Sequence, residues 1–245
     1  MSVDGLPSGV AIGRQSWTGR PTWRGAGYQT LIGAASLAVG PLVMAVGDLL
    51  HPKETSDISG QAAIIVEHAT RWYLAHLLLF IGLVLFVPGL LTLTGLSAAR
   101  RPRVGYAARV LMVIGVGGTA AIFVAEMLAG RLGALGPAAT QEFLDTMFSG
   151  PIAGPMLPVG LAFFVSAAVF AVPLIVDAGP LRWPAVVLLV GILLVLAEIL
   201  SSQVLLSQIG NLLIWSGSVA FAWRLVRGET GAPARARAGQ ALPTG

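Results

Sequence analysis

The 245-residue sequence contains no cysteine and few charged residues. Without cysteine, the chain can form no disulfide, thiolate metal site, c-type haem attachment or thiol nucleophile. Charged residues make up 11% of the chain and hydrophobic residues 56%, whereas a soluble domain carries about a quarter charged residues. The composition therefore indicates an integral membrane protein.

The chain also lacks the motifs of several enzyme classes. It has no P-loop, no H-E-x-x-H pair, no G-x-S-x-G elbow and no Rossmann fingerprint. The glycines Gly115, Gly117 and Gly118 follow no predicted strand, so we expect them to allow close helix packing instead. Aspartate-rich diphosphate motifs and the D-x-D-D acid motif are absent too. Magnesium-assisted ionisation of a diphosphate is therefore not expected.

Six apolar runs are each close to the roughly 20 residues that cross a 30 Å hydrocarbon layer. They are predicted at residues 28–50, 72–97, 106–130, 155–176, 183–201 and 205–224. We therefore predict an all-α fold, a polytopic bundle of about six transmembrane helices within residues 28–226. Residues 1–27 are predicted to form a flexible cytoplasmic tail, and residues 227–245 a disordered one.

The charged residues are divided between the two sides of this six-span topology. Twelve of the fifteen Lys and Arg residues fall on one side, the exceptions being Lys53, Arg71 and Arg131. Short loops rich in Lys and Arg stay in the cytoplasm, so we predict a cell-membrane protein with both termini cytoplasmic. The arginines suit anionic lipid headgroups rather than nucleic acid. All three histidines and eight of the eleven acidic residues fall on the other side, which predicts a polar cavity opening toward the extracytoplasmic face.

The two outer loops, at residues 51–71 and 131–154, contain amphipathic segments. Apolar residues recur at helical spacing from Ile58 to Trp72, which predicts an amphipathic helix at the membrane interface. The second loop has an amphipathic turn at residues 141–148. That turn is either a lid over the cavity or, as the plainer interpretation, an interfacial connector.

Carboxyl groups at membrane depth are the first candidate site residues, because a carboxylate in hydrocarbon is costly unless it is paired, hydrated or protonated. Glu126, in FVAEMLAG, and Glu198, in LVLAEILSSQ, fall in the outer halves of the third and fifth spans. Polar residues follow Glu198 as far as Asn211. Burial favours the neutral form of a carboxylic acid, so either glutamate can donate a proton. The alternative is that each is neutral and hydrogen-bonded to a neighbouring helix.

The three histidines, His51, His68 and His76, are the other candidates. His76 lies about one turn inside the second span, where a helix-to-helix hydrogen bond and a catalytic or metal role are equally consistent with its position. His51 can be an interface residue beside Asp48, and His68 a solvated one. A metal or haem site built from the three histidines is the main alternative function, since imidazole suits zinc, copper and iron. In it, Asp48 or Glu67 completes the ligand shell.

Two further alternatives follow from the two glutamates and from the compact bundle. A proton-coupled transporter would use Glu126 and Glu198 as a relay. A non-catalytic assembly subunit would use neither.

An apolar chamber with buried carboxylic acids suits protonation of a lipophilic epoxide or alkene. In its compact multi-span build, its length and its acidic residues without aspartate-rich motifs, the chain resembles the small integral-membrane terpene cyclases of meroterpenoid and indole-sesquiterpenoid pathways. The segments VGDLLHP and RWYLAHLLL also resemble segments of small actinobacterial membrane proteins.

The resemblance to the cyclases implies cyclisation of an isoprenoid-type substrate, with no cofactor, by a protein whose other partners are membrane lipids. Glu126 or Glu198 would be the general acid, and His76 and Asp48 would tune it. The aromatic residues expected to line the chamber are Trp72, Tyr73, Phe123 and Trp215.

Overall fold

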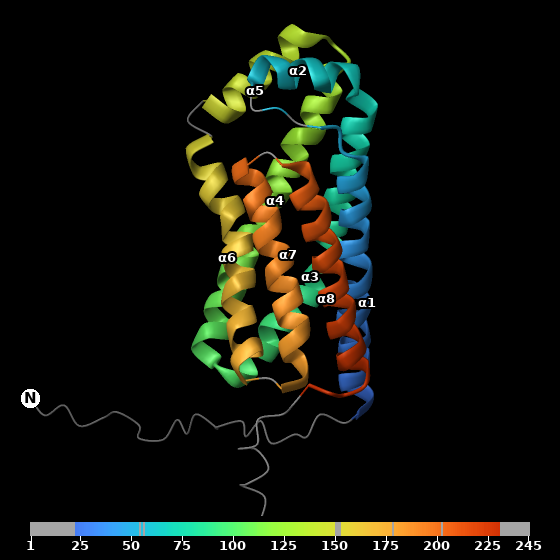
Figure 1. Ribbon diagram of the computed structural model, residues 1–245, viewed down its shortest axis with the longest axis vertical. Helices are drawn as coiled ribbons and strands as arrows, with labels where there is room; N and C mark the ends of the chain where they lie inside the picture. Colours follow the sequence, from blue (N-terminus) through green and yellow to red (C-terminus); the bar gives the residue numbers. More distant parts are fainter. Residues whose placement is uncertain are drawn as a thin grey trace, which may run out of the picture.

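The computed structural model is entirely helical wherever regular structure occurs in the described part of the chain (Figure 1). The described residues are 23–53, 55, 57–149, 153–177, 179–201 and 203–230. Their elements are α1 (Trp23–Leu50), α2 (Ile58–Glu67), α3 (Ala69–Arg100), α4 (Pro102–Gly133), α5 (Pro137–Ser149), α6 (Ala153–Asp177), the 3-10 turn η1 (Gly179–Leu181), α7 (Arg182–Ser201) and α8 (Val204–Val226). Most of the two predicted tails lies outside the described residues, and α1 begins within residues 1–27, at Trp23.

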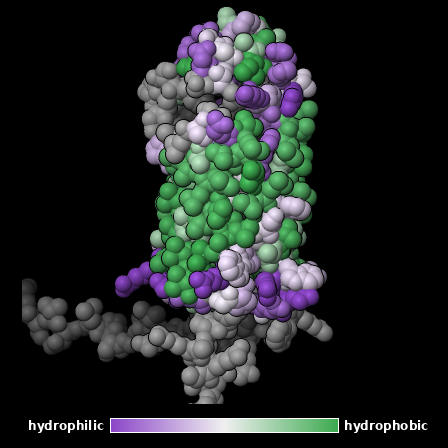
Figure 2. Space-filling model, viewed as in Figure 1, coloured by the Kyte–Doolittle hydropathy of each residue, from purple (hydrophilic) through white to green (hydrophobic). Residues whose placement is uncertain are grey.

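Six of these helices, α1, α3, α4, α6, α7 and α8, are long and apolar enough to cross a membrane. Figure 2 shows an apolar band across the middle of the face in view, with polar residues gathered at both ends. The predicted polytopic helical membrane bundle is therefore confirmed. At 32 residues each, α3 and α4 are about 48 Å long, longer than the roughly 30 Å hydrocarbon layer.

The six long helices form a closed ring in the order α1, α3, α4, α6, α7 and α8, with α8 packed back on α1. Glycines allow the close crossings in this ring. A Cβ atom at Gly115 of α4 would lie 2.1 Å from the backbone nitrogen of Phe163 in α6, and one at Gly118 would also clash with α6. The predicted packing role is confirmed for these two residues. It is wrong for Gly117, which has open space around its missing Cβ.

Two shorter helices, α2 and α5, lie across one end of the ring, which we call the capped end (Figure 1). Asp57 begins α2 as its N-cap, because its Oδ2 atom accepts hydrogen bonds from the Gly60 backbone nitrogen and the Ser59 hydroxyl, both at 2.7 Å. The apolar face of α2 is buried against protein. This small core contains Ala62, Ile65, Trp72, Ala129 and Leu144. The predicted amphipathic helix therefore exists, but it ends at Glu67 and covers the bundle.

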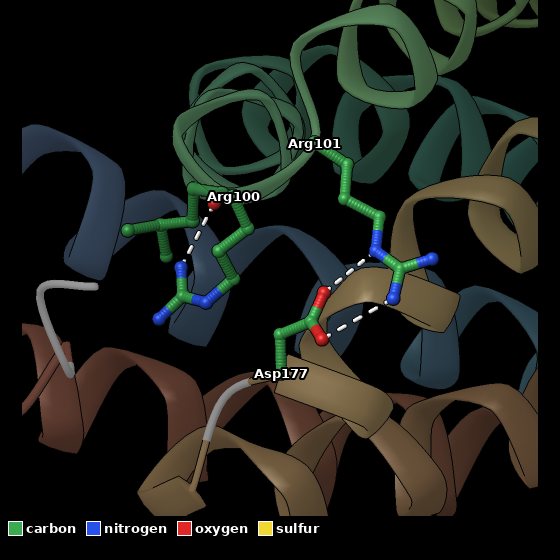
Figure 3. A network of polar contacts seen from close by, with 4 residues as sticks. Arg100, Arg101 and Asp177 are labelled. Carbon is green, nitrogen blue, oxygen red and sulfur yellow. Dashed lines mark hydrogen bonds and ion pairs between the residues drawn. The ribbon is translucent and has the colours of Figure 1, made fainter. Parts of the chain in front are cut away.

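The opposite end carries most of the described arginines and is called the arginine end. Here α1 begins, α8 ends, and the α3–α4 and α6–α7 turns lie close together (Figure 1). Arg101, between α3 and α4, donates two hydrogen bonds to Asp177 at the end of α6, at 2.7 and 3.2 Å (Figure 3). This hydrogen-bonded carboxylate raises the pKa of Arg101. Arg100 turns away from the pair and donates to the carbonyl oxygen of Leu96.

Candidate functional site

A cavity of about 230 Å³ lies inside the ring, and all six long helices contribute to its walls. An engineered apolar cavity of about 150 Å³ accommodates benzene, so this space suits a larger lipophilic molecule. Most of the wall is apolar. The polar lining residues are Asp48, Thr119, Glu198, Ser207 and Asn211, and the aromatic ones are Phe123, Phe163 and Phe164.

Asp48 reaches the cavity from the last turn of α1, near the capped end. Its carboxyl group accepts a hydrogen bond from the Ser207 hydroxyl at 3.4 Å and another from the Asn211 side chain. Ser207 and Asn211 are four residues apart on α8, so both fall on the face of that helix that meets α1. The carboxyl group is thus fixed between two helices at the cavity wall.

Glu198 reaches the same cavity from the last turn of α7, the helix on the other side of α8. Its side chain is half-buried. Two carboxyl groups predicted from the sequence, Asp48 and Glu198, are therefore brought to one apolar space. They come from helices that are about 150 residues apart in the chain.

Glu126, which is a described residue, is not among those that line the cavity. It follows Thr119 and Phe123 on one face of α4, because positions i, i+4 and i+7 of a helix point the same way. One carboxyl oxygen of Glu126 is buried. Its backbone carbonyl accepts a hydrogen bond from Nε1 of Trp72 at 3.1 Å.

His51 and His76 form a close pair beside the cavity, on the side that faces the capped end of the ring. Their Nε2 atoms are 3.3 Å apart, and their rings meet edge to face. Trp72 packs against both rings, with centroid distances of 4.5 Å to His51 and 5.0 Å to His76. Phe123 connects the pair to the cavity, because it lines the cavity and its ring centroid is 6.3 Å from that of His76.

The outer Nδ1 atom of each histidine faces a backbone carbonyl. Nδ1 of His51 is 2.7 Å from the carbonyl oxygen of Pro52, and Nδ1 of His76 is 3.0 Å from that of Trp72. Burial lowers the pKa of His51, and the Pro52 carbonyl and the Asp48 charge offset part of this shift. The positive charge of Arg71 lowers that pKa further. His51 is therefore held mainly in its neutral form.

Arg71 fixes the backbone that carries His51. Its guanidinium donates to the carbonyl oxygen of Leu50 at 2.6 Å and to that of His51 at 3.4 Å. The end of α1 is thus tied to the start of α3. This connection brings together two histidines that are 25 residues apart in the sequence.

The other predicted site residues lie elsewhere. Tyr73 packs under the guanidinium of Arg131, 4.2 Å from its ring centre. Trp215 donates from Nε1 to the carbonyl oxygen of Ala38 at 3.1 Å and so fastens α8 to α1. Of the four predicted lining aromatics, all within the described residues, Phe123 alone is among the residues that line the cavity.

His68 does not join the other two histidines. It forms the turn between α2 and α3, and its Nε2 atom is 3.9 Å from a carboxyl oxygen of Glu67. Within the part of the chain that the structure describes, no three His, Asp or Glu side chains are placed to hold a metal ion together. A three-histidine shell completed by Asp48 or Glu67 is therefore not assembled there.

Several lining residues were not among the predicted site residues. Phe163 and Phe164, whose rings meet edge to face at 5.5 Å, resemble any other apolar residues of a span in the sequence. Thr119 follows three glycines and gives no separate signal. Ser207 could have been found, because its spacing of four residues from Asn211 predicts a polar stripe on one helix face.

No family model matches the chain, and no curated protein or solved structure is significantly similar to it. What the protein does must therefore be inferred from the cavity and the side chains around it.

Proposed function

We propose that this membrane protein is an enzyme that protonates a lipophilic, isoprenoid-type molecule in the cavity and thereby starts its cyclisation. The observation that supports this most is the presence of Asp48 and Glu198 in the wall of one largely apolar cavity. An acid in a dry, apolar site is suited to protonating an alkene or epoxide. The resemblance to small integral-membrane terpene cyclases points to the same chemistry.

Glu198 is the proposed general acid. Its O–H bond breaks as the proton is transferred to the substrate. On an alkene, a C–H bond forms at the expense of the π bond; on an epoxide, an O–H bond forms and a C–O bond of the ring breaks to leave a hydroxyl group. Either step leaves a carboxylate and a carbocation. The π electrons of a second alkene close the ring, and loss of a proton from the final cation to Glu198 restores the acid. Atoms and electrons balance without a cofactor, since the overall reaction is an isomerisation.

The remaining wall residues suit such an intermediate. Phe123, Phe163 and Phe164 place aromatic rings at the cavity, and aromatic faces stabilise cations by about 0.5–2 kcal/mol. The apolar walls limit quenching of the cation by water. Asp48, held by Ser207 and Asn211, is the second carboxyl group of the cavity wall.

The orientation is also proposed. We place the protein in the cell membrane with both termini in the cytoplasm, because the arginine end would then satisfy the preference of Lys and Arg for that side. The start of α1 and the end of α8 both lie at that end. The cavity, which lies toward the capped end, would then be in the outer half of the membrane.

The test is to incubate membranes that contain the protein with unsaturated and epoxidised isoprenoids and to identify cyclic products by mass spectrometry. We expect Glu198→Gln to lower the rate by at least about 100-fold, since a positioned general acid contributes about 10²- to 10⁴-fold. The matched control is Glu142→Gln. Glu142 is an exposed glutamate of α5, so this variant is expected to keep full activity.

Three results would contradict the proposal in different ways. Full activity of Glu198→Gln would remove the proposed acid. A loss in Glu126→Gln alone would assign the proton to a residue outside the cavity wall. Binding of an isoprenoid by the wild-type protein, with no product formed from either substrate class, would indicate a carrier rather than an enzyme.

A further inference from the structure

A second, smaller cavity of about 20 Å³ adjoins the main one, and the proposed acid chemistry does not use it. Four residues line both spaces: Met44, Phe163, Asn211 and Ile214. Of the described residues that line the smaller cavity, Asn211 alone is polar, and its side chain is hydrogen-bonded to Asp48. The smaller cavity is therefore an apolar space, and empty apolar spaces in proteins stay dry.

The two cavities are stacked along the axis of the ring. On α3, which begins at the capped end, Leu79 lines the main cavity and Leu90 lines the smaller one. On α7, which begins at the arginine end, Leu188 lines the smaller cavity and Ile199 lines the main one. Both helices therefore place the smaller cavity on the side of the arginine end.

The carboxyl groups lie at the opposite end of this combined space. Asp48 is one turn beyond Met44 on α1, in the direction of the capped end. Glu198 is ten residues beyond Leu188 on α7, in the same direction. The combined space thus has acids at one end and apolar walls at the other. It suits a molecule with a polar group at one end only, because each end then meets groups of its own kind.

We propose that the two cavities together bind one extended hydrocarbon chain with a polar end group, and that Ala167 of α6 limits the length of this chain. This inference rests on the proposed function, because it concerns the substrate of the same cavity. The polar end lies beside Asp48 and Glu198, and the apolar end reaches the smaller cavity. Met44 lines both spaces, and its unbranched side chain has three rotatable bonds, so it can turn aside to let the chain pass.

The two helices also give the length of the combined space. Leu79 and Leu90 are 11 residues apart on α3, and so are Leu188 and Ile199 on α7. At about 1.5 Å per residue, each pair spans about 16 Å. An extended chain advances about 1.2 Å per bond, since the three backbone bonds of a residue span at most about 3.3–3.6 Å. The space therefore holds a chain of about 13 bonds.

Ala167 is the smallest of the residues that line the smaller cavity, and it is 2% exposed. A water molecule needs about 10–15 Å³ of such space, so a cavity of about 20 Å³ has room for one or two methyl-sized groups. Valine in place of alanine adds two methyl groups at this position. Ala167→Val should therefore fill the apolar end of the space and shorten the accepted chain by about two carbons.

The experiment uses the full chain, purified in detergent, with unbranched primary alcohols of about 8 to 18 carbons as probes. The readout is the midpoint of thermal unfolding at one alcohol concentration, since a ligand that binds only the folded state raises this midpoint. For the wild type, we expect the midpoint to rise with chain length up to about 13 carbons and then to rise no further. For Ala167→Val, the rise should end about two carbons earlier.

Ala222→Val is the matched control. Ala222 is a buried alanine of α8, 8% exposed, and it is not among the residues that line either cavity. The same substitution at this position should leave the limiting chain length unchanged. All three proteins are compared in the same detergent, so partition of the alcohols into micelles affects them equally.

The proposal would be overturned by a wild-type midpoint that keeps rising up to the longest alcohol, by no rise with any alcohol, or by an unchanged limit in Ala167→Val. The wild-type series needs no variant, so the test stands even where Ala167→Val fails to fold. Failure of the proposed function would look different. A limit that shifts in Ala167→Val, without cyclic products from isoprenoids, would keep the chain-binding site and remove the enzyme. Cyclic products without such a limit would keep the enzyme and remove the chain-binding site.

Discussion

Replacement of Gly115 by alanine tests the contact between α4 and α6, which forms one wall of the cavity. The new Cβ atom would lie 2.1 Å from the backbone nitrogen and 2.4 Å from the Cα atom of Phe163. These are backbone atoms, so no side-chain rotation can relieve the clash. Ordinary contact begins near 3.4 Å, so α6 would have to move by at least about 1.3 Å at this point.

The expected loss follows from two opposing effects. Overpacking of a tight interface costs about 1–3 kcal/mol, and we expect the upper end because the backbone itself is in the way. Alanine is more favourable than glycine in a helix by about 1 kcal/mol. Gly115→Ala should therefore lower the free energy of unfolding by about 2 kcal/mol.

Gly117→Ala is the matched control, two residues away in the same helix. No atom lies within 4 Å of a Cβ at this position, so only the gain in helix propensity of up to about 1 kcal/mol remains. The two variants should thus differ by about 3 kcal/mol when unfolding in mixed detergent micelles is followed by circular dichroism. If Gly115→Ala were as stable as Gly117→Ala, the backbones of α4 and α6 would not be in contact there, and Phe163 would not line the cavity as described.

Two further predictions concern the capped end. Trp72→Ala should lower the free energy of unfolding by about 3–5 kcal/mol, because Trp72 is 1% exposed and packs against the histidine pair. Trp183, which is 73% exposed, is the control, and Trp183→Ala should change the free energy of unfolding by less than about 0.5 kcal/mol. Equal losses in the two variants would argue against the packing of Trp72. The Ser59 hydroxyl and the Gly60 N–H lower the pKa of Asp57, so its stabilisation of α2 is complete above the unfolded value of 3.8 and is lost as the pH falls through the lower folded pKa. Hydrogen exchange in α2 from neutral pH to below 3.8 should show this loss. Asp57→Asn keeps the cap but should remove the pH dependence, and an unchanged dependence would refute the assignment.

The spans could be predicted because their requirement is local. About 20 consecutive apolar residues satisfy it whatever the neighbouring helices do. The predicted end of the fifth span, Ser201, is also the end of α7. The first predicted span, residues 28–50, agrees with the part of α1 that can cross a membrane, Gly27–Leu50, although the helix itself already begins at Trp23.

The rotation of each helix about its axis could not be predicted in the same way. Glu126 and Glu198 look equivalent in the sequence, as single acids in the outer halves of two spans. In the structure, Glu198 lines the cavity, and Glu126 is not among the lining residues. Tyr73 follows Trp72 directly, yet it points to Arg131 while Trp72 is buried, because adjacent helical residues are about 100° apart.

The sequence by itself determined that the chain enters a membrane, where its six spans lie and which polar residues are found at membrane depth. Each of these properties depends on the hydrophobicity of one short segment, so each can be read from that segment without knowing its neighbours in the fold. The closed order of the ring, the placement of Asp48 and Glu198 in the wall of one cavity and the approach of the His51 and His76 rings were decided only by the tertiary structure. They depend on which helices are neighbours and how each is turned, and side chains from separate segments set both through their packing.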